Sequence, residues 1–540
     1  MAQPNQTSEE ATRDNIVSWD GPDDQANPKN WSFKRRWLAT GLVSLITFMT
    51  PLTSSMIAPA QTQIGDDLGV HSTFQLQLIF SIFLLAFIFG PLFVAPLSEV
   101  YGRVIVLQLS NIFFLVWNLV CGFAQTEGQM LAFRFLSGLG ACTPQTVGGG
   151  VLSDLWRSEE RGTAVALYTL APILGPSLGP IIGAWIAERT TWRWCFWAVT
   201  IFGVVVQVLI YFTLPETYGP RILYWKAEKL RKETGNQRLR TQFELEDRRW
   251  STIMAHAIVR PFRLLFTQPI IQFLAAYLSL VYGIIYLMLS TFPTVWTDIY
   301  HESTGIGGLN YLSLAIGMTL GAQSGGRIVD LTYKRLSARA PNKKGRPEFR
   351  IPILFVSTAL ISGGLFMYGW SAQERTHWIV PNIGAAIFGM GTTISFTSLQ
   401  TYTIDAYTVY AASAIGTTAV TRSCTGFGFP LFAPAMYNSL GWGWGNSVLG
   451  FAALGVGYLG AFVLWFFGER LRAASPFAAN PEEKDDGNEE RIEKDKEDLE
   501  KGTKDNDQSA LQDMESGSQK DPDEHGEKDT KGDLEEQPSS

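Results

Sequence analysis

The sequence predicts an all-α polytopic membrane protein with 12 transmembrane helices in two pseudo-symmetric six-helix bundles. Three observations support this prediction. Only 17% of the 540 residues are charged, whereas about 25% is usual for a soluble protein. Twelve apolar runs each approach the roughly 20 residues that a helix needs to cross a bilayer. A turn that follows the second run, at 90–103, is repeated 231 residues downstream, at 321–334.

The chain divides into five segments. A polar N-terminal segment, 1–36, precedes the first six runs, and a basic central segment, 215–269, connects them to the last six. The first runs span 37–60, 74–97, 104–124, 131–153, 163–187 and 194–214. The second set spans 270–296, 307–329, 351–370, 378–400, 411–437 and 444–467. We therefore predict six-helix bundles at 37–214 and 270–467. Helices are favoured, because barrel strands would alternate over about ten residues.

The distribution of basic residues predicts the orientation. One set of loops holds Lys34, Arg103, Arg157, the whole central segment, the 334–350 loop and Arg470. The opposite set holds only Arg189, Arg193 and Arg375. Loops rich in lysine and arginine face the cytoplasm, so an even number of spans places both termini there. We expect a multi-pass protein of the plasma membrane.

The last segment, 468–540, is acidic and nearly free of aromatic residues. Residues 481–540 contain 23 acids and 9 bases, so that the other 480 residues carry a net charge of +7. Such a composition cannot bury enough apolar surface to fold, and we predict a disordered cytoplasmic tail. The pI of 5.5 describes this tail, and no nucleic-acid partner is indicated. The four cysteines lie singly in apolar runs, so we expect neither a disulfide, a metal nor a cofactor.

The repeated turn places a carboxylate four residues before a base. It reads Gly90-Pro-Leu-Phe-Val-Ala-Pro-Leu-Ser-Glu99-Val-Tyr-Gly-Arg103 in the first half and Gly321-Ala-Gln-Ser-Gly-Gly-Arg-Ile-Val-Asp330-Leu-Thr-Tyr-Lys334 in the second. A four-residue step brings acid and base one helical turn apart. Unpaired charges at a membrane face are expensive, and further partners are expected at nearby span ends: Asp154, Arg161 and Asp405.

Two six-span halves, a long central loop and this turn resemble the major facilitator superfamily over about residues 30–470. Glu99 stands where many members have aspartate. The resemblance implies the major facilitator fold, and a latch in which Glu99 and Arg103 close the cytoplasmic face when the transporter opens outward. An ion pair that only caps helices is the alternative. Span four resembles a second motif of the superfamily, whose arginine, here Arg134, is associated with proton or substrate handling. Snorkelling of Arg134 to the membrane surface is the alternative.

Span five resembles a motif that marks drug antiporters among major facilitators. It contains prolines at 172, 176 and 180, which share one helical stripe and bend the helix, and small residues that allow close helix contact. The motif residues are Gly175, Pro176, Gly179, Pro180 and Gly183. Ala166 and Ala184 stand where the pattern has glycine. A kinked helix that serves only packing is the alternative.

A narrower resemblance is to the fungal twelve-span drug:proton antiporters. It is carried by Asn27-Pro-Lys-Asn-Trp-Ser, Leu214-Pro-Glu-Thr-Tyr, Asp405-Ala-Tyr, Arg422-Ser and Phe429-Pro-Leu-Phe432. Members of that family export multiple drugs, mycotoxins and other small organic compounds. The resemblance therefore implies an efflux pump.

Candidate residues for a substrate or proton path lie inside the spans. Arg422 is near the middle of span eleven, too deep to snorkel, and marks a functional site unless it bonds backbone carbonyls. Tyr277, Tyr282 and Tyr286 suit flat organic ligands if they do not simply pack, and Gln145 and Asn382 supply amides. Carboxylates occur only at span ends, which favours a neutral or weakly anionic substrate over a polyamine.

The leading hypothesis is a secondary transporter that exports small organic compounds by proton antiport and alternating access. An uptake permease of the same fold is the alternative, and a non-transporting sensor is a third. No Walker motif and no nucleophile–base set are present, so we expect neither ATP-driven transport nor an enzyme. The expected partners are a small organic substrate, protons and the lipid bilayer, with the protein as a monomer.

Overall fold

The computed structural model describes residues 15–157, 160–244, 250–340, 345–475 and 477–478. The acidic tail predicted at 468–540 lies outside the described residues from 479 onward, as do the first 14 residues of the N-terminal segment. Within the described ranges the chain is almost entirely helical, and its one sheet has two short strands.

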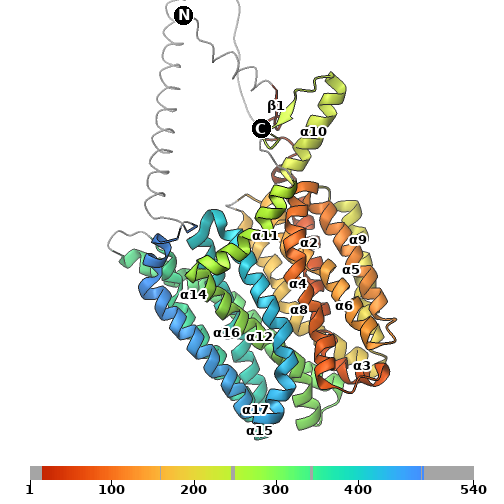
Figure 1. Ribbon diagram of the computed structural model, residues 1–540, viewed down its shortest axis with the longest axis vertical. Coiled ribbons are helices and arrows are strands. Elements are labelled where there is room, and N and C mark those ends of the chain that lie inside the picture. The colour runs from red at the N-terminus through yellow and green to blue at the C-terminus, as the bar shows by residue number, and fades with distance from the viewer. Residues whose placement is uncertain (1–14, 158–159, 245–249, 341–344, 476, 479–540) are drawn as a thin grey trace, which may run out of the picture. The chain divides into compact units, whose positions relative to one another are not determined.

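The first half is a bundle of long helices joined by short turns (Figure 1). Its α-helices are α2 (Phe33–Ser55), α3 (Gln61–Leu68), α4 (Thr73–Tyr101), α5 (Arg103–Cys121), α6 (Glu127–Ala141), α7 (Thr143–Leu155), α8 (Arg161–Arg189) and α9 (Arg193–Thr213). The 3-10 turns are η1 (Pro28–Asn30) and η2 (Ala58–Ala60). Helix α2 packs against α8, and α6 packs against both α4 and α5.

The second half repeats this arrangement. Its helices are α12 (Pro269–Thr294), the π-helical turn η3 (Val295–Ile299), α13 (Thr304–Leu309), α14 (Tyr311–Arg339), α15 (Pro352–Gln373), α16 (Ile379–Tyr407) and α17 (Ala411–Ala473). The 3-10 turns are η4 (Pro347–Arg350) and η5 (Thr408–Tyr410). Helix α12 packs against α17, and α16 packs against both α14 and α15.

Nine helices of the described residues are long and apolar enough to cross a membrane, and they carry ten of the twelve predicted spans. Spans eleven and twelve are merged in α17, which breaks at Gly441 with φ +73°. Span four is divided at Cys142 into α6 and α7, so each piece is shorter than a full span. Span eight is α14, which lies outside the nine.

A small unit connects the halves and includes the N-terminal segment. It consists of α10 (Gly219–Thr234), α11 (Trp250–Thr267) and a parallel sheet in which β1 (Ile16–Val17) pairs with β2 (Arg240–Thr241). Lys226 of α10 strengthens this contact, because its Nζ atom donates to Asp20 Oδ1 at 2.6 Å and to the carbonyl of Ser18 at 2.9 Å. We call the bundle ends next to α10 the α10 face, and the opposite ends the α3 face (Figure 1).

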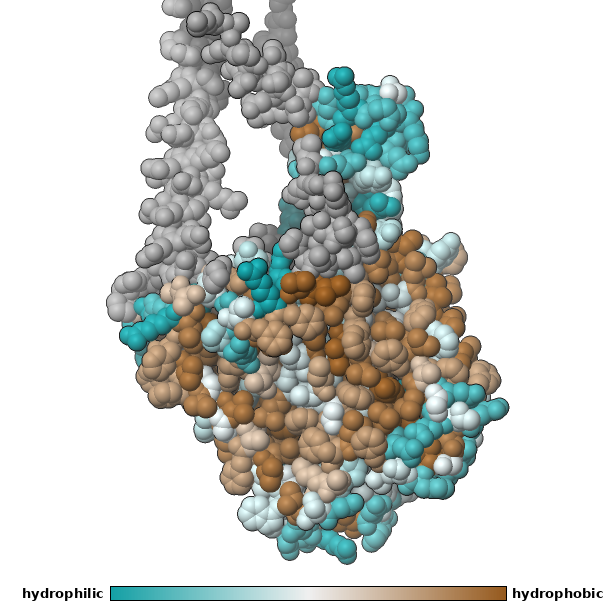
Figure 2. All heavy atoms as spheres, in the orientation of Figure 1, coloured by the Kyte–Doolittle hydropathy of each residue, from teal (hydrophilic) through white to brown (hydrophobic). Residues whose placement is uncertain are grey.

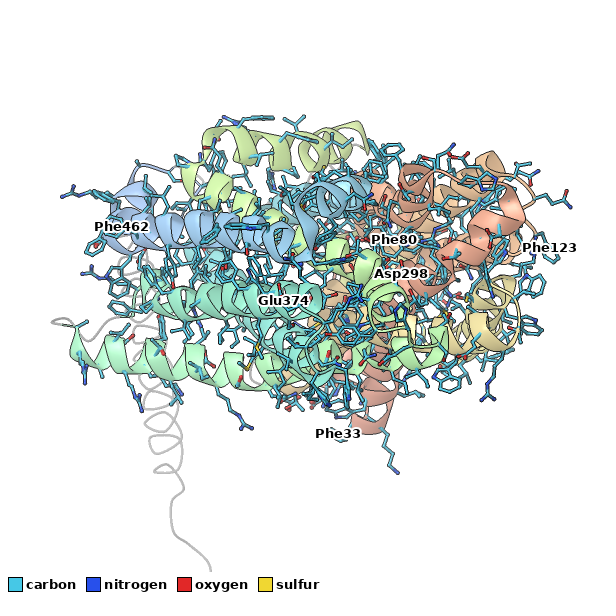
Figure 3. All side chains as sticks on the ribbon, turned by 90° about the horizontal axis from the view of Figure 1, so that it is seen from below. Phe33, Phe80, Phe123, Asp298, Glu374 and Phe462 are labelled. Atoms are coloured by element: carbon cyan, nitrogen blue, oxygen red, sulfur yellow. The ribbon has the colours of Figure 1, made fainter. Side chains whose placement is uncertain are left out.

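Several elements hold the halves together: α4 contacts α17, α8 contacts α14 and α13, and η2 contacts α12. Seen from the α3 face in Figure 3, Phe80 of α4 lies between the halves, whereas the exposed Phe123 and Phe462 lie at opposite sides. A site shared by the halves is therefore expected among these elements and α2.

Apolar side chains cover the sides of both bundles. In Figure 2 hydrophobic residues dominate the middle of the visible face, and hydrophilic ones gather toward its two ends. Exposed Leu109, Val116, Ile201 and Leu459 are examples. This pattern is expected where hydrocarbon, rather than water, is the solvent of the helix bundle.

Candidate functional site

At the α10 face of the first half, an arginine and an aspartate form a partly buried ion pair. Arg103 is the first residue of α5 and Asp154 is near the end of α7. The Arg103 Nε atom donates to Asp154 Oδ2 at 3.0 Å, and both side chains are about one-sixth exposed. The guanidinium also stacks 4.9 Å from the ring of Tyr218. Span three is thereby fixed to the end of span four.

Glu216 caps the N-terminus of α5, a role that sequence reasoning missed. Its carboxylate accepts the backbone N–H of Arg103 at 2.9 Å and that of Val104 at 3.1 Å. It also accepts from Thr217 and Tyr218. Residue 102 has φ +107° and the carboxylate lies against its Cα, so only glycine fits there. The stretch Leu214-Pro-Glu-Thr-Tyr, which the sequence singled out, was the available signal.

The second half contains a matching pair with a different base from the one expected. Arg350 precedes α15, and its Nε atom donates to Asp405 Oδ2 at 2.7 Å while Nη1 lies 3.3 Å from Asp330 Oδ1. Arg350 stacks 4.7 Å from Tyr333. Lys334 is exposed, and no described residue pairs with it. The structure therefore pairs Asp330 with Arg350, because the loop after α14 returns to this face.

The two ion pairs occupy equivalent places. In each half an arginine at the start of the third span meets an aspartate at the end of the fourth, as Arg103 meets Asp154 and Arg350 meets Asp405. Glu99, the expected partner of Arg103, is exposed and contacts no basic residue among those described. The side chain of Arg161 lies outside the described part of the chain.

The last span of the second half is also tied to the third. Arg472, near the end of α17, donates from Nε and Nη2 to both oxygens of Glu348, at 2.7 and 3.0 Å. Both side chains are buried. In the first half Glu216 follows the last span and makes the corresponding connection to the third. Its carboxylate accepts from the backbone N–H groups of Arg103 and Val104 instead of from a basic side chain.

The antiporter-motif residues of α8 form its contact with α2. A Cβ atom at Gly175 would lie 2.6 Å from the Pro51 ring, and one at Gly179 would lie 2.6 Å from Ser55 Oγ. Gly183 contacts the carbonyl of Met56 directly. Pro176 and Pro180 interrupt the hydrogen bonds of α8 in the same segment. Spans one and five therefore approach backbone to backbone.

At the α3 face the short helix α13 packs on α8. A Cβ atom at Gly308 would overlap the methyl group of Ala184. Asn382, predicted on the substrate path, lies in a neighbouring polar group, where it donates to Asn310 Oδ1 at 2.6 Å. Asn310 donates in turn to Glu302 at 2.7 Å. Glu302 is in the loop before α13, and burial raises the pKa of its carboxyl, opposed by the bond from Asn310.

Arg134 is enclosed between the helices of the first half. Its side chain is 1% exposed, and Nη2 donates to the carbonyls of Phe80 at 3.1 Å and Ser54 at 3.5 Å. The aromatic rings of Phe83 and Phe196 lie 5.3 and 5.8 Å away. Snorkelling is therefore excluded in this conformation.

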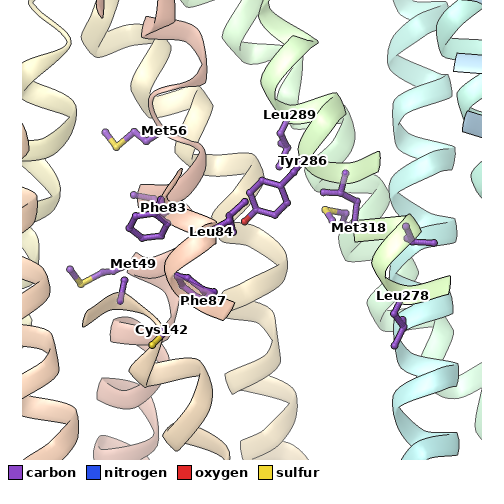
Figure 4. Close-up of a cluster of buried hydrophobic side chains, with 14 of the residues drawn as sticks. Met49, Met56, Phe83, Leu84, Phe87, Cys142, Leu278, Tyr286, Leu289 and Met318 are labelled. Atoms are coloured by element: carbon purple, nitrogen blue, oxygen red, sulfur yellow. The ribbon is translucent and has the colours of Figure 1, made fainter. Parts of the chain in front are cut away.

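Ser54 connects this arginine to the second half. Its hydroxyl lies 3.0 Å from the hydroxyl of Tyr286 on α12, and Figure 4 shows the Tyr286 hydroxyl pointing toward Leu84 of α4. Tyr286 and Tyr282 have ring centroids 4.9 Å apart. Arg422 of α17 is half-buried and stacks 5.3 Å from Tyr282. These residues form a continuous polar and aromatic seam across the interface, which we call the Ser54–Arg422 seam.

The other predicted path residues lie elsewhere. Tyr277 is fully buried within the second half, where its hydroxyl lies 2.8 Å from Thr358 Oγ1 and 3.2 Å from Ser395 Oγ. Gln145 is half-buried near the start of α7, and its carbonyl accepts from Tyr168 at 3.5 Å. Neither residue forms a hydrogen bond or a ring contact with a described residue of the Ser54–Arg422 seam. The described residues contain no group of three or more His, Cys, Asp or Glu side chains that could hold a metal.

Comparisons with known proteins agree with this architecture. Residues 43–428 match the family model described as Major Facilitator Superfamily. The chain is 50% identical over 472 residues to the efflux pump vrtL of Penicillium aethiopicum, covering 87% of this chain and 93% of the relative. It is 41% identical over 469 residues to the efflux pump radE of Floropilus chiversii, covering 87% of each.

Solved structures share the fold at low sequence identity. The xylose transporter XylE from E. coli, in a partially occluded inward-open conformation, gives a TM-score of 0.56 at 17% identity, covering 80% of this chain and 99% of that one. A bacterial homologue of the human lysosomal transporter Spinster gives 0.59 at 14% identity, covering 84% and 100%. The two bundles, the paired turns and the sequence matches together show that the chain belongs to the Major Facilitator Superfamily.

Proposed function

We propose that this protein exports small organic compounds from the cytoplasm by proton antiport at the plasma membrane. Two relatives that are named efflux pumps, at 50% and 41% identity, support the direction of transport. The α10 face is the cytoplasmic one in this proposal, because the exposed bases Lys334, Arg335 and Arg339 lie at that end of α14.

The observation that carries the proposal is the Ser54–Arg422 seam. It places hydroxyl, aromatic and guanidinium groups between the two halves, where an otherwise apolar interface would suffice for packing. Substrate sites of repeat-built transporters lie at such an interface near the bilayer midplane. Rocking of 37–214 against 270–467 exposes the seam to one side at a time.

The ion pairs at the α10 face serve as gate elements in this mechanism. Arg103 with Asp154 and Arg350 with Asp405 each hold the third and fourth spans of one half together. Both pairs lie within a half, so each half moves as one body. Glu99 and Lys334, which have no partner among the described residues, are available to meet new partners when the halves change position.

The test is transport by purified protein in liposomes with an imposed pH gradient. Compounds drawn from a library of small organic molecules should be moved against their own gradient, and dissipation of the pH gradient should abolish that movement. Arg103→Ala should reduce the rate at normal insertion, whereas substitution of the exposed Arg339 by alanine should not. Movement of a compound that does not respond to the pH gradient would rule out antiport.

A further inference from the structure

The two arginines near the seam have opposite surroundings. Arg134 is closed off: it is 1% exposed and donates to two backbone carbonyls. Arg422 is only half-buried, and its guanidinium lies 5.3 Å from the ring of Tyr282. The guanidinium forms no hydrogen bond and no ion pair with any other described residue. The five N–H donors of its guanidinium therefore have no oxygen acceptor in the described structure. Arg422 is the cation that a ligand in the interface would meet.

Neither charge is neutralised by an acid in the part of the chain that the structure describes. No carboxylate of the described residues contacts Arg134 or Arg422, and the acids of the neighbouring helices lie at their ends, as Glu99 of α4 and Asp154 of α7 do. Two positive charges near a low-dielectric interface favour an anion and oppose a further cation. The missing counter-charge is therefore best supplied by the substrate.

The neighbours of Arg422 are aromatic. Tyr282 lies 4.9 Å from Tyr286 and 6.3 Å from Phe396, and Phe80 lies 6.4 Å from Tyr286, all between ring centroids. Three of these residues come from the second half and Phe80 from the first. Tyr286 and Phe80 are buried by these contacts, whereas Tyr282 is only partly buried, so a planar ring that enters the interface would meet the ring of Tyr282.

We propose that the exported substrate is an aromatic organic acid, bound as its carboxylate or phenolate anion to Arg422 with its ring against Tyr282. The proposal rests on the export function proposed above and names the substrate class of the same seam. Planar guanidinium donors bind such oxygen anions with two parallel hydrogen bonds. An amine of the same shape is excluded from the seam, because it would approach two arginines without a carboxylate.

The experiment measures binding separately from transport. A panel of aromatic carboxylic acids and phenols, the methyl esters and methyl ethers of the same rings, and the corresponding amines is titrated onto the purified full-length protein at pH 7.5. Acids should bind about tenfold or more tightly than their esters, because a charge-assisted hydrogen bond contributes about 1.4 kcal/mol or more. Phenols should gain the same preference as the pH rises through their own pKa.

Three variants locate the preference. Arg422→Gln should abolish the difference between acid and ester, and Arg422→Lys should keep the sign of the preference with weaker binding. Arg327→Gln, at an exposed arginine of α14 without a partner among the described residues, should bind like wild type. The elution profile of each variant in detergent establishes that it is folded.

The outcomes separate the two proposals. If acids and esters bind equally, if amines bind more tightly, or if no acid binds, the substrate class is overturned. Persistence of the acid preference in Arg422→Gln would also overturn the substrate class. Export of a neutral or cationic compound by pH-gradient-driven liposomes would leave the export function intact while removing the substrate class. Binding of acids without any pH-driven transport would leave the substrate class intact while removing the export function.

Discussion

Removal of the Glu216 carboxylate tests how the α10 face of the first half is held together. In Glu216→Ala the N–H groups of Arg103 and Val104 lose their acceptor at 2.9 and 3.1 Å. Loss of a helix cap destabilises by about 1 kcal/mol, and loss of a negative charge at a helix N-terminus by roughly another 0.5–1 kcal/mol. We therefore expect a loss of about 2 kcal/mol.

The loss should be visible as thermal instability. For a bundle of this size, about 2 kcal/mol lowers the apparent melting temperature by roughly 4–8 °C, measured in detergent by the fraction that remains monodisperse after heating. Glu216→Gln should lie between wild type and alanine, because its amide keeps one acceptor oxygen but carries no charge. Transport should fall as well, since the cap fixes Arg103 against Asp154.

Glu99→Ala is the matched control. Glu99 is a carboxylate near the same turn, but it is exposed and has no basic partner among the described residues. Its loss should change the melting temperature by less than about 2 °C. Equal melting temperatures for the two alanine variants would refute the capping role of Glu216.

Two further predictions concern the α3 face and the C-terminal end of the second bundle. Gly308→Ala should slow transport and destabilise the fold by about 1–3 kcal/mol, because the added methyl group overlaps Ala184 of α8. Gly128→Ala is the control, because a methyl group there meets no atom outside its own helix within 4 Å. Equal transport rates in the two variants would contradict the contact between α13 and α8. Glu348→Gln should destabilise by about 3–5 kcal/mol, because it removes the buried carboxylate that accepts from Nε and Nη2 of Arg472. The double variant Glu348→Gln with Arg472→Gln should regain part of the lost thermal stability. Arg346→Gln, which removes one partner of an exposed ion pair, should leave the thermal stability nearly unchanged. A double variant no more stable than Glu348→Gln would contradict this explanation.

Most of the fold could be predicted from the sequence, because membrane-spanning helices can be recognised from the length and hydrophobicity of their segments. One break was not predicted. The break in α17 at Gly441 falls between the spans predicted at 411–437 and 444–467, whereas the division of span four at Cys142 was not expected. Pro144, in the first turn of α7, was the available signal. Helix α13 was hidden for another reason, since its run of glycines carries no hydrophobic periodicity.

The site was predictable in its residue types and less so in its pairings. Helical spacing placed Asp330 one turn from Lys334, but the structure chooses Arg350, 20 residues away, because a loop brings it back. The periodicity within a helix does not show where a later loop brings a distant residue back to that helix. The choice between a functional and a snorkelling Arg134 stayed open for a similar reason: distance from the helix end does not show that α2 and α4 close over this side chain.

The strand pairing of β1 with β2 has a consequence for the order in which the protein is made. Ile16 must pair with Arg240, so about 220 residues, including the entire first bundle, are synthesised between the two strands. At a synthesis rate of about 5–20 residues per second, roughly 10–45 s pass between the synthesis of β1 and that of β2. The N-terminal segment can therefore pair with β2 only after the six spans of the first bundle have been synthesised.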